Sequence, residues 1–508
     1  MHHPLRLLAL LLLPGALTAQ TPATVQRAAQ SITPEDIRRR IGIIADDSMR
    51  GRDTPSPELD KVATYIAGEF RRLGLKPGGD SGTFVQRYAI NRVQFVPESS
   101  AAFVHGGASD VSLTYGKDYL FIDNAFESGD YAGDLVLLSG PVAGALTADT
   151  AALAGKMLIF ATGPRNRAER QRVIAWKPAG IVLITPAPDS VWATIAARNS
   201  RVQLRDPGRQ VGPPIILAAR VSSLQPVVTP FGADLAAAQS ATAFEARPLT
   251  GAQLHVHGRI RAVERNSAPN VVGILEGSDP RLKNEYVVYS AHMDHVGVAG
   301  PAGSGGCRAQ GADSICNGAD DDGSGTVAVI EAAEAFVALT PRPKRSIIFL
   351  TVSGEEKGLW GSAYFAEHPP VPIASIVADL NIDMVGRNWK DTVVVIGKEH
   401  SDLGATLNRV AAAHPELHMR PIDDIWPQEN FYFRSDHFNF ARKGVPILFF
   451  FSGTHPDYHQ PGDSPDKIDA EKEARIVRLA FYLGLDVANS AERPKWNPDS
   501  YKRIVTGN

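Results

Sequence analysis

The chain has 508 residues, a length that suits about three domains of roughly 150 residues or one large α/β enzyme with an insertion. Hydrophobic residues make up 44%, charged residues 21% and aromatic residues 7%, which excludes the disordered, collagen-like and coiled-coil classes of protein. Lysine and arginine total 52 against 55 for aspartate and glutamate, so the formal charge is -3. Because this balance leaves no basic surplus to neutralise phosphates, we expect no nucleic-acid partner.

The first 19 residues have the pattern of a secretory signal peptide. Arg6 precedes the apolar run Leu7–Leu13, Pro14 breaks that run, and the segment closes on the small residue Ala19. We therefore predict that residues 1–19 are removed and that the protein is secreted or periplasmic. An uncleaved membrane anchor is the alternative interpretation. No later apolar run reaches the ~20 residues of a spanning helix, so we expect no membrane span after signal removal.

Residues 20–94 contain one clear helical pattern. Apolar residues recur every three to four positions, at Leu59, Val62, Ile66, Phe70 and Leu73. This spacing predicts a helix over Pro57–Leu73, with Gly74 as its stop. We assign the helix to the same α/β domain as the C-terminal half of the chain.

Residues 95–255 have a different pattern, with short apolar runs separated by glycine, proline and aspartate turns. Examples are Asp134–Ser139, Lys156–Ala161 and Gly180–Thr185. Runs of this length between turn residues indicate strands. We therefore predict a separate β-rich domain, inserted between the two parts of the α/β domain.

Residues 256–490 alternate between strand and helix patterns, and 491–508 form a C-terminal tail. The predicted strands are Tyr286–Ser290, Ser346–Val352, Ile376–Ile382 and Val445–Phe451, and the clearest helix is Gly325–Leu339. Alternation of this kind predicts an α/β fold with a mostly parallel central sheet flanked by helices.

Polar clusters follow each of these predicted strands. His292 and Asp294 follow the first, Glu355 and Glu356 the second, Asp383 the third, and His455 and His459 the fourth. A run of three aspartates, Asp320–Asp322, lies just before the predicted helix. Because the carboxyl ends of parallel strands meet at one edge of a sheet, we expect these clusters to converge.

Histidine and carboxylate donors without thiolates suit catalytic zinc. One carboxylate can bridge two divalent ions that activate water, and in a Glu-Glu pair one glutamate can bind metal while the other accepts a proton. Taken alone, a His-x-Asp pair more often lies on the surface. A run of aspartates, taken alone, can be a helix cap or a calcium-type turn. Their common position at strand and helix ends favours a hydrolase site. There Asp294 can hold the free imidazole nitrogen of His292.

Five segments carry a resemblance to a known family: Ala291–Gly297, Asn317–Gly325, Ser353–Ser362, Asn381–Met384 and Tyr458–Asp463. Together they resemble the signature segments of the secreted two-zinc aminopeptidase family. That family includes bacterial leucyl aminopeptidases and, more distantly, glutamate carboxypeptidase and glutaminyl cyclase. The resemblance covers most of the chain after about Asn266 and also Asp46–Leu75. The inserted region is similar to the protease-associated domain of some members.

The resemblance also implies residue roles. The metal ligands that it implies are His292 and Asp383 for one zinc ion, Glu356 and His459 for the other, and Asp321 as the bridge. It further implies that Glu355 is the general base and Asp294 the partner of His292. Tyr458 matches a tyrosine that in some members donates a hydrogen bond to the developing oxyanion, although a packing role is equally compatible with its position.

The resemblance implies an exported metallo-exopeptidase that acts on peptides, with two Zn²⁺ ions and an aminopeptidase activity. A glutamate carboxypeptidase-like enzyme and a non-catalytic binding protein on the same scaffold are the alternatives. The sequence does not indicate an oligomeric state. His295 and His437 are expected to be structural hydrogen bonders. Ser435-Asp436-His437 is not a serine-hydrolase triad, because triad members come from separate loops and no Gly-x-Ser-x-Gly surrounds the serine.

Cys307 and Cys316 are the only cysteines of the chain. Export to an oxidising compartment predicts that they form a disulfide. The bond would close the loop that joins the segment after His292 to Asp321. Two free thiols or two additional metal ligands are the alternatives.

Overall fold

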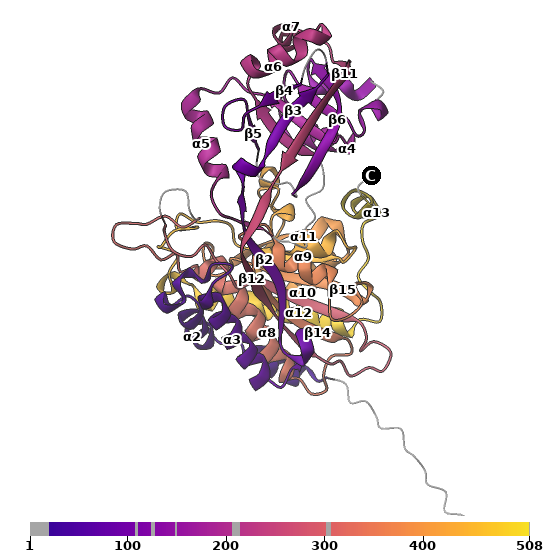
Figure 1. Cartoon of the computed structure of the whole chain (residues 1–508). Coiled ribbons are helices and arrows are strands. Elements are labelled where there is room, and N and C mark those ends of the chain that lie inside the picture. Colours follow the sequence, from indigo (N-terminus) through magenta and orange to yellow (C-terminus); the bar gives the residue numbers. More distant parts are fainter. Residues whose placement is uncertain are drawn as a thin grey trace, which may run out of the picture. The chain divides into compact units, whose positions relative to one another are not determined.

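The computed structural model describes residues 20–106, 110–122, 128–147, 150–205, 214–300 and 306–506. The predicted signal peptide and most of the glycine-rich stretch before Cys307 lie outside these residues. The chain divides into two compact units, one built from the residues up to Tyr88 and from Ser267 onward, the other from Ala89–Asn266. Two strands, β2 (Val85–Phe95) and β12 (Ile260–Leu275), carry the chain between the units (Figure 1).

The first unit is built on a mixed, mostly parallel sheet. Its strand order is β17 (Arg420–Ile422), β16 (Thr392–Ile396), β18 (Ile447–Phe451), β15 (Ile376–Ile382), β13 (Tyr286–His292), β14 (Ser346–Val352), β12 and β2. The short strand β1 (Lys76–Pro77) pairs antiparallel with β12. Strands β18, β15, β13 and β14 are mutually parallel, and β16 and β12 flank them antiparallel. The predicted fold class is therefore confirmed.

Helices cover both faces of this sheet. Phe336 of α8 (Gly325–Val337) packs on Tyr289 and Phe349. On the other face of the sheet, Phe440 of α11 (His437–Ala441) and Phe365 of α9 (Trp360–Glu367) share a buried cluster with Val288. Val288 precedes Tyr289 in β13, so the two side chains point to opposite faces. Burial on both faces explains why β14 and β15 are nearly continuous apolar runs.

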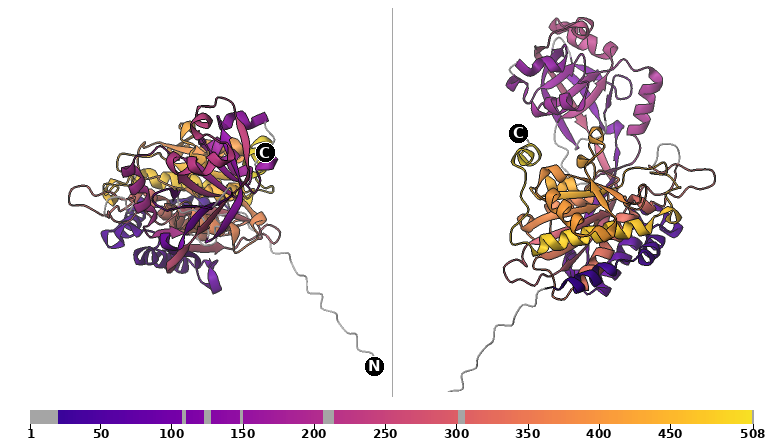
Figure 2. Two further views of the ribbon diagram at one scale, coloured as in Figure 1. Left: turned by 45° about the horizontal axis from the view of Figure 1, so that its top comes forward. Right: turned by 180° about the vertical axis from the view of Figure 1, so that it is seen from behind.

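The α8 side of the sheet carries the long helix α12 and the N-terminal helices. These are α1 (Pro22–Gln30), α2 (Pro34–Ile44), α3 (Pro57–Arg72) and α12 (Ala470–Asn489). Figure 2 shows α12, in yellow, beside the indigo N-terminal helices, and α12 contacts α8, α2 and α1. Helix α3 lies close to its predicted range, because the Ser56 side chain caps it and Gly74, with a φ of +70°, ends it.

The second unit contains its own sheet with the order β4 (Val111–Leu113), β3 (Ala101–His105), β11 (Glu245–Gly258), β6 (Gly129–Ser139), β7 (Met157–Phe160), β8 (Gly180–Ile184), β10 (Ile215–Ala219) and β5 (Tyr119–Phe121). A short strand, β9 (Gln203–Arg205), pairs with the second half of β2. The described helices here are α4 (Arg167–Ala175), α5 (Asp189–Asn199), α6 (Val221–Val228) and α7 (Leu235–Ser240). Several alanine-rich stretches between the predicted strands are therefore helical, and the unit combines strands with helices.

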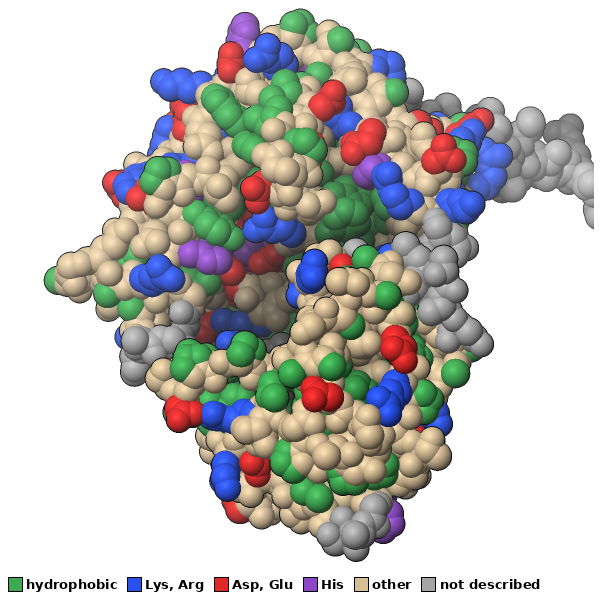
Figure 3. All heavy atoms as spheres, turned by 90° about the horizontal axis from the view of Figure 1, so that it is seen from above, with side chains coloured by type: hydrophobic (Ala, Val, Ile, Leu, Met, Phe, Trp, Pro, Cys, Tyr) green, Lys and Arg blue, Asp and Glu red, His purple; other side chains and the backbone are tan. Residues whose placement is uncertain are grey.

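Charged side chains of both signs are interspersed on the face drawn in Figure 3, in keeping with the near-neutral composition. Within the part of the chain that the structure describes, no helix has both the length and the apolar character needed to cross a membrane.

Candidate metal centre

The predicted site residues meet at the carboxyl edge of the parallel strands. His292 is the last residue of β13, Asp383 follows β15 directly, and Glu356 follows β14 by four positions. His459 lies in the loop after β18. Because β14, β13, β15 and β18 run in parallel, their ends bring these side chains to one place, as the sequence predicts.

Asp321 lies at the centre of this cluster. Its Oδ1 lies 3.3 Å from His292 Nε2, and its Oδ2 lies 3.1 Å from His459 Nε2. His292 Nε2 is also 3.8 Å from Asp383 Oδ1, and His459 Nε2 is 3.2 Å from Glu356 Oε1. Asp321 therefore belongs to two groups of possible metal ligands, one with His292 and Asp383 and one with His295 and Glu356, and His459 lies beside the second group.

The aspartates on either side of Asp321 have different partners. Asp320 Oδ1 accepts a hydrogen bond of 2.6 Å from the amide of Gly386. Asp322 accepts hydrogen bonds from the amides of Gly325, at 2.8 Å, and His292, at 3.0 Å. Both outer carboxylates thus fix backbone segments around the site. Asp320 Oδ2 also lies 3.3 Å from His455 Nε2, whereas Asp321 faces His292 and His459.

Arg52 is a buried residue of this site that the sequence reasoning missed. Its side chain has no exposed surface, and its guanidinium donates to the backbone carbonyls of Met293 at 2.8 Å, Gly318 at 2.6 Å and Asp321 at 3.2 Å. A further short contact reaches the carbonyl of Asn317. One cation therefore joins the loop after His292 to the loop that carries Asp321. The sequence did contain a signal for Arg52, because this residue lies in Asp46–Leu75, the N-terminal segment that takes part in the family resemblance.

Asp294 contacts His292 through its backbone as well as its side chain. His292 Nδ1 lies 3.1 Å from the Asp294 carbonyl oxygen, whereas the nearer carboxylate oxygen is 3.6 Å away. The carboxylate instead accepts a hydrogen bond of 2.8 Å from the Thr54 hydroxyl and one of 3.3 Å from the Glu355 amide. His292 Nδ1 therefore faces both the carbonyl and the carboxylate of Asp294, and Nε2 of His292 faces Asp321 and Asp383.

The buried donors of the cluster are suited to a cation. No hydrogen bond within the described structure satisfies Asp321 Oδ2, Glu356 Oε1, Asp383 Oδ1 or His459 Nε2. Although burial disfavours its charged form, contacts with Asp321 and Glu356 raise the pKa of His459 to about 10. Burial and Asp321 likewise oppose ionisation of Glu356, but His295 and His459 lower the pKa of Glu356 to about 2. Nitrogen and carboxylate oxygen atoms gathered in this way fit zinc.

A cavity of about 50 Å³ opens beside these ligands. Its lining includes Glu355 and Tyr458 together with Met384, Phe431, Phe449 and Phe451. Burial, followed by the nearby carboxylates, raises the pKa of Glu355 well above its ordinary value despite the opposing effect of His292. Burial likewise raises the pKa of Tyr458. A carboxyl group that is a better base than usual therefore lines the same cavity as the ligands.

The segment Ser435–His437 is not arranged as a triad. The Ser435 hydroxyl donates a hydrogen bond of 2.9 Å to Asp383 Oδ2, so it supports a candidate ligand. His437 Nε2 lies 2.9 Å from the carbonyl of Tyr432, and burial lowers the pKa of His437 to about 3. His437 is thus a neutral structural hydrogen bonder, as expected.

His295 differs from its expected role. It has no exposed surface, and no hydrogen bond among the described residues satisfies either ring nitrogen. Its Nδ1 lies 3.0 Å from Glu356 Oε1 and 3.6 Å from Asp321 Oδ2. The structure therefore adds a third histidine to the cluster. The sequence favoured a structural role for His295 because a histidine at a crowded strand end is more often a satisfied hydrogen bonder.

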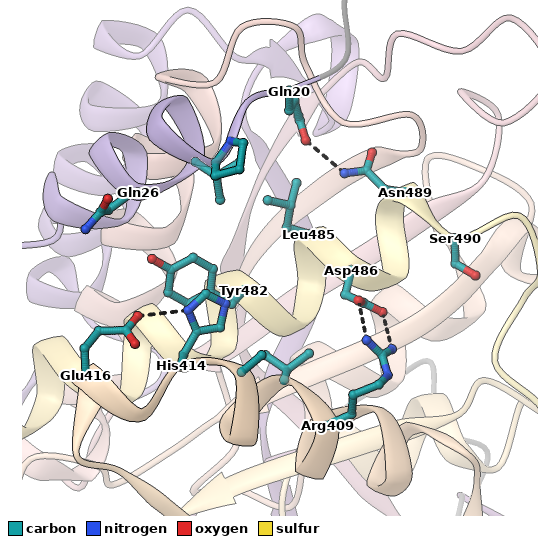
Figure 4. Close-up of a pocket in the computed structure, with 14 residues that line it drawn as sticks. Gln20, Gln26, Arg409, His414, Glu416, Tyr482, Leu485, Asp486, Asn489 and Ser490 are labelled. Atoms are coloured by element: carbon teal, nitrogen blue, oxygen red, sulfur yellow. Dashed lines mark hydrogen bonds and ion pairs between the residues drawn. The ribbon is translucent and has the colours of Figure 1, made fainter.

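A larger cavity of about 900 Å³ lies elsewhere in the first unit, between α1, α12 and α10 (Leu403–Ala413) (Figure 4). Its polar side chains pair with one another: Arg409 with Asp486 at 2.8 and 3.0 Å, Gln20 with Asn489 at 2.9 Å, and His414 with Glu416 at 2.9 Å. The described lining includes none of the predicted site residues, so we place the functional site at the smaller cavity.

Part of the chain is similar to known peptidases. Residues 270–484 match Peptidase family M28. The chain is 26% identical over 228 residues to a probable leucine aminopeptidase of Trichophyton verrucosum, covering 43% of this chain and 58% of the relative. It is 24% identical over 248 residues to aminopeptidase YwaD of Bacillus subtilis, covering 47% and 48%. A probable zinc metalloprotease of Pyrenophora tritici-repentis is 40% identical over 225 residues, covering 36% and 46%.

The chain thus spans about half the length of the curated relatives that it matches. Among solved structures, an aminopeptidase from Aneurinibacillus sp. strain AM-1 aligns with a TM-score of 0.49 and 17% identity, covering 93% of this chain and 97% of that one. A zinc aminopeptidase of Bacillus subtilis aligns with a TM-score of 0.44 and 17% identity, covering 89% and 95%. Residues 270–484, which match Peptidase family M28, contain every candidate ligand described above.

Proposed function

We propose that this protein is a zinc-dependent aminopeptidase that releases residues from the free amino end of peptides. The observation that carries the proposal is the position of Asp321, with one carboxylate oxygen 3.3 Å from His292 Nε2 and the other 3.1 Å from His459 Nε2. A carboxylate that faces a different histidine with each oxygen is suited to bridging two zinc ions. The names of the similar proteins support the same activity.

In this proposal each ion has its own ligands. His292 and Asp383 hold one ion, Glu356 and His459 hold the other, and Asp321 is shared. Three carboxylates offset much of the charge of two divalent ions, which favours double occupancy. When bound, zinc supplies Lewis-acid polarisation of the scissile carbonyl group and lowers the pKa of water.

Glu355 transfers the proton. It takes a proton from the water that attacks the peptide carbonyl carbon and delivers it to the leaving nitrogen as the carbon–nitrogen bond breaks. The raised pKa of Glu355 suits both steps, because a carboxylate of ordinary pKa would be a weaker base. Tyr458 lines the same cavity, where its phenol can donate a hydrogen bond to the oxygen that gains charge.

The cavity wall suggests a substrate class. Besides polar and ionisable groups, the cavity lining contains the apolar side chains of Met384, Phe431, Phe449 and Phe451. We therefore propose that an apolar side chain of the amino-terminal residue binds against this wall, because burying apolar surface from water is favourable by about 25 cal/mol per Å².

We also propose that the protein is exported and that its inserted unit is of the protease-associated type. The basis for export is the sequence pattern of residues 1–19. Sequencing of the mature amino terminus tests this part, and a first residue of Gln20 is the expected result.

A panel of substrates tests the activity. We expect the purified protein to hydrolyse leucine and phenylalanine anilides with a free amine faster than the lysine or glutamate anilides, and to leave amino-acetylated peptides intact. A chelator should abolish hydrolysis and added zinc should restore it. Activity on blocked peptides alone would support a carboxypeptidase instead, and bound zinc without hydrolysis of any peptide would support a non-catalytic binding protein.

A further inference from the structure

His295 has the surroundings of a metal ligand. Its ring is fully buried, and its Nδ1 approaches Glu356 Oε1 at 3.0 Å and Asp321 Oδ2 at 3.6 Å. His459 Nε2 approaches the same two oxygens at 3.2 and 3.1 Å. Two imidazole nitrogens therefore face one pair of carboxylate oxygens.

These separations match the spacing of atoms that share one zinc ion. Bonds of about 2.0–2.2 Å at tetrahedral angles separate neighbouring ligand atoms by about 3.4 Å. The four nitrogen–oxygen distances at this pair of oxygens range from 3.0 to 3.6 Å. Nδ1 of His295 therefore lies at ligand spacing from both oxygens, and His295, Asp321 and Glu356 form a group whose ligand atoms lie within 4.8 Å of one another.

Two other buried histidines of the first unit, His437 and His400, have hydrogen-bond partners, whereas His455 has none among the described residues and lies 3.3 Å from Asp320 Oδ2. His437 Nε2 lies 2.9 Å from a backbone carbonyl oxygen, and His400 Nδ1 lies 3.1 Å from the Ser500 hydroxyl. A buried imidazole in a structural role is normally satisfied in this way. Within the described structure His295 has no such partner and instead contacts two carboxylates that face a second histidine.

The backbone around His295 makes room for its ring. Gly318 has a φ of +61°, and a Cβ atom at that position would lie only 2.5 Å from Cγ of His295. Gly318 belongs to the loop that also carries Asp321. The loop that supplies the shared carboxylate is therefore shaped to accept this histidine.

We propose that His295 Nδ1 is a ligand of the metal ion that Glu356 and His459 hold, an inference that rests on the proposed zinc site. This ion then has two imidazoles and two carboxylates, whereas the ion at His292 has one imidazole and two carboxylates. The site that contains His295 is the tighter one, so a chelator removes the ion at His292 first.

Metal titration of the purified protein tests the proposal. For His295→Ala we expect zinc at the tighter site to bind more weakly, by more than the roughly 10–100-fold that follows loss of an outer-shell partner. His437→Gln is the matched control, because it replaces a buried histidine of the same unit and should retain both ions. Unfolding of the zinc-free variants monitors folding separately. Unchanged zinc affinity in a folded His295→Ala would overturn the proposal.

A thiolate at position 295 gives a direct reading of ligation. A cysteine side chain at this position is short, but Nδ1 is the ring nitrogen of histidine that lies nearer the backbone. Because a zinc–sulfur bond is also about 0.2–0.3 Å longer than a zinc–nitrogen bond, the cysteine sulfur reaches the same ion. In His295→Cys loaded with Co²⁺ we expect a thiolate-to-cobalt charge-transfer absorption, and in His437→Cys none. Absence of this absorption in a folded His295→Cys protein that binds Co²⁺ would contradict ligation. If the wild-type protein itself bound no zinc, the proposed function would fail instead.

Discussion

Replacement of Arg52 tests whether one buried cation holds the metal-binding loops together. Its guanidinium donates to three carbonyl groups at 2.6–3.2 Å and makes a further short contact with a fourth. Hydrogen bonds from a charged group contribute about 1.5–3 kcal/mol each, and their loss would leave buried carbonyl oxygens without partners. Because such contributions do not add fully, we expect Arg52→Met to lower the free energy of unfolding by about 4–6 kcal/mol.

Arg52→Lys separates charge from geometry. An ammonium group carries three donors on a single nitrogen and cannot reach carbonyls that lie in two directions, so we expect about half of the loss seen with methionine. Neighbouring Arg50 is exposed, and Arg50→Met serves as the matched control with a change within about 0.5 kcal/mol.

The assay is urea unfolding of the zinc-free protein, followed by circular dichroism, with zinc content measured in parallel. Since Arg52 joins the loops of Met293 and Asp321, we expect zinc affinity to fall together with stability. If Arg52→Met unfolded within about 1 kcal/mol of the wild type and kept both ions, the reasoning from these hydrogen bonds would be refuted.

Four further predictions concern the proposed chemistry and the loop between Cys307 and Cys316. Glu355→Gln should lower turnover by roughly 10²-fold or more with zinc content nearly unchanged; loss of metal would mean that Glu355 is the ligand. Wild-type activity should also fall as pH drops through the raised pKa of Glu355, because the base must be deprotonated. Asp321→Asn should reduce zinc stoichiometry, and full retention with a normal rate would exclude it as the bridge. Cys307 and Cys316 are disulfide-bonded in the structure, and reduction should impair activity before unfolding, since the chain-entropy model gives this short loop only about 2–3 kcal/mol. Alkylation under denaturing, non-reducing conditions that added two groups would contradict the disulfide.

The sequence predicted the central sheet well because its strands are buried on both faces. Strands β14 and β15 have the predicted bounds, since each is an apolar run that ends at a polar residue or glycine. The bounds of these two strands also predicted the positions of Glu356 and Asp383, because each residue follows directly or closely after the end of its strand, where the ends of parallel strands meet.

The second unit was harder to predict because its helices are short. Helix α7 has six residues and α5 eleven, and both are rich in alanine. With so few large apolar residues, neither has a clear apolar stripe at helical spacing. Their stability depends on packing against the sheet, which a local pattern does not contain.

The contacts that complete the site are long-range, which is why local patterns did not reveal them. Arg52 donates to carbonyls 241 to 269 positions away, and its immediate neighbours in the chain do not indicate these partners. His295 shows the same limitation at shorter range. Strict alternation after β13 would place His292 and His295 on opposite sides of the chain, yet both contact Asp321, one at each carboxylate oxygen. The strand ends at His292, so the following residues are free to bring His295 around the shared carboxylate. The end of the strand at His292 is thus the reason that alternation did not predict the position of His295. It also allows one short segment to supply a histidine to each of the two proposed metal sites.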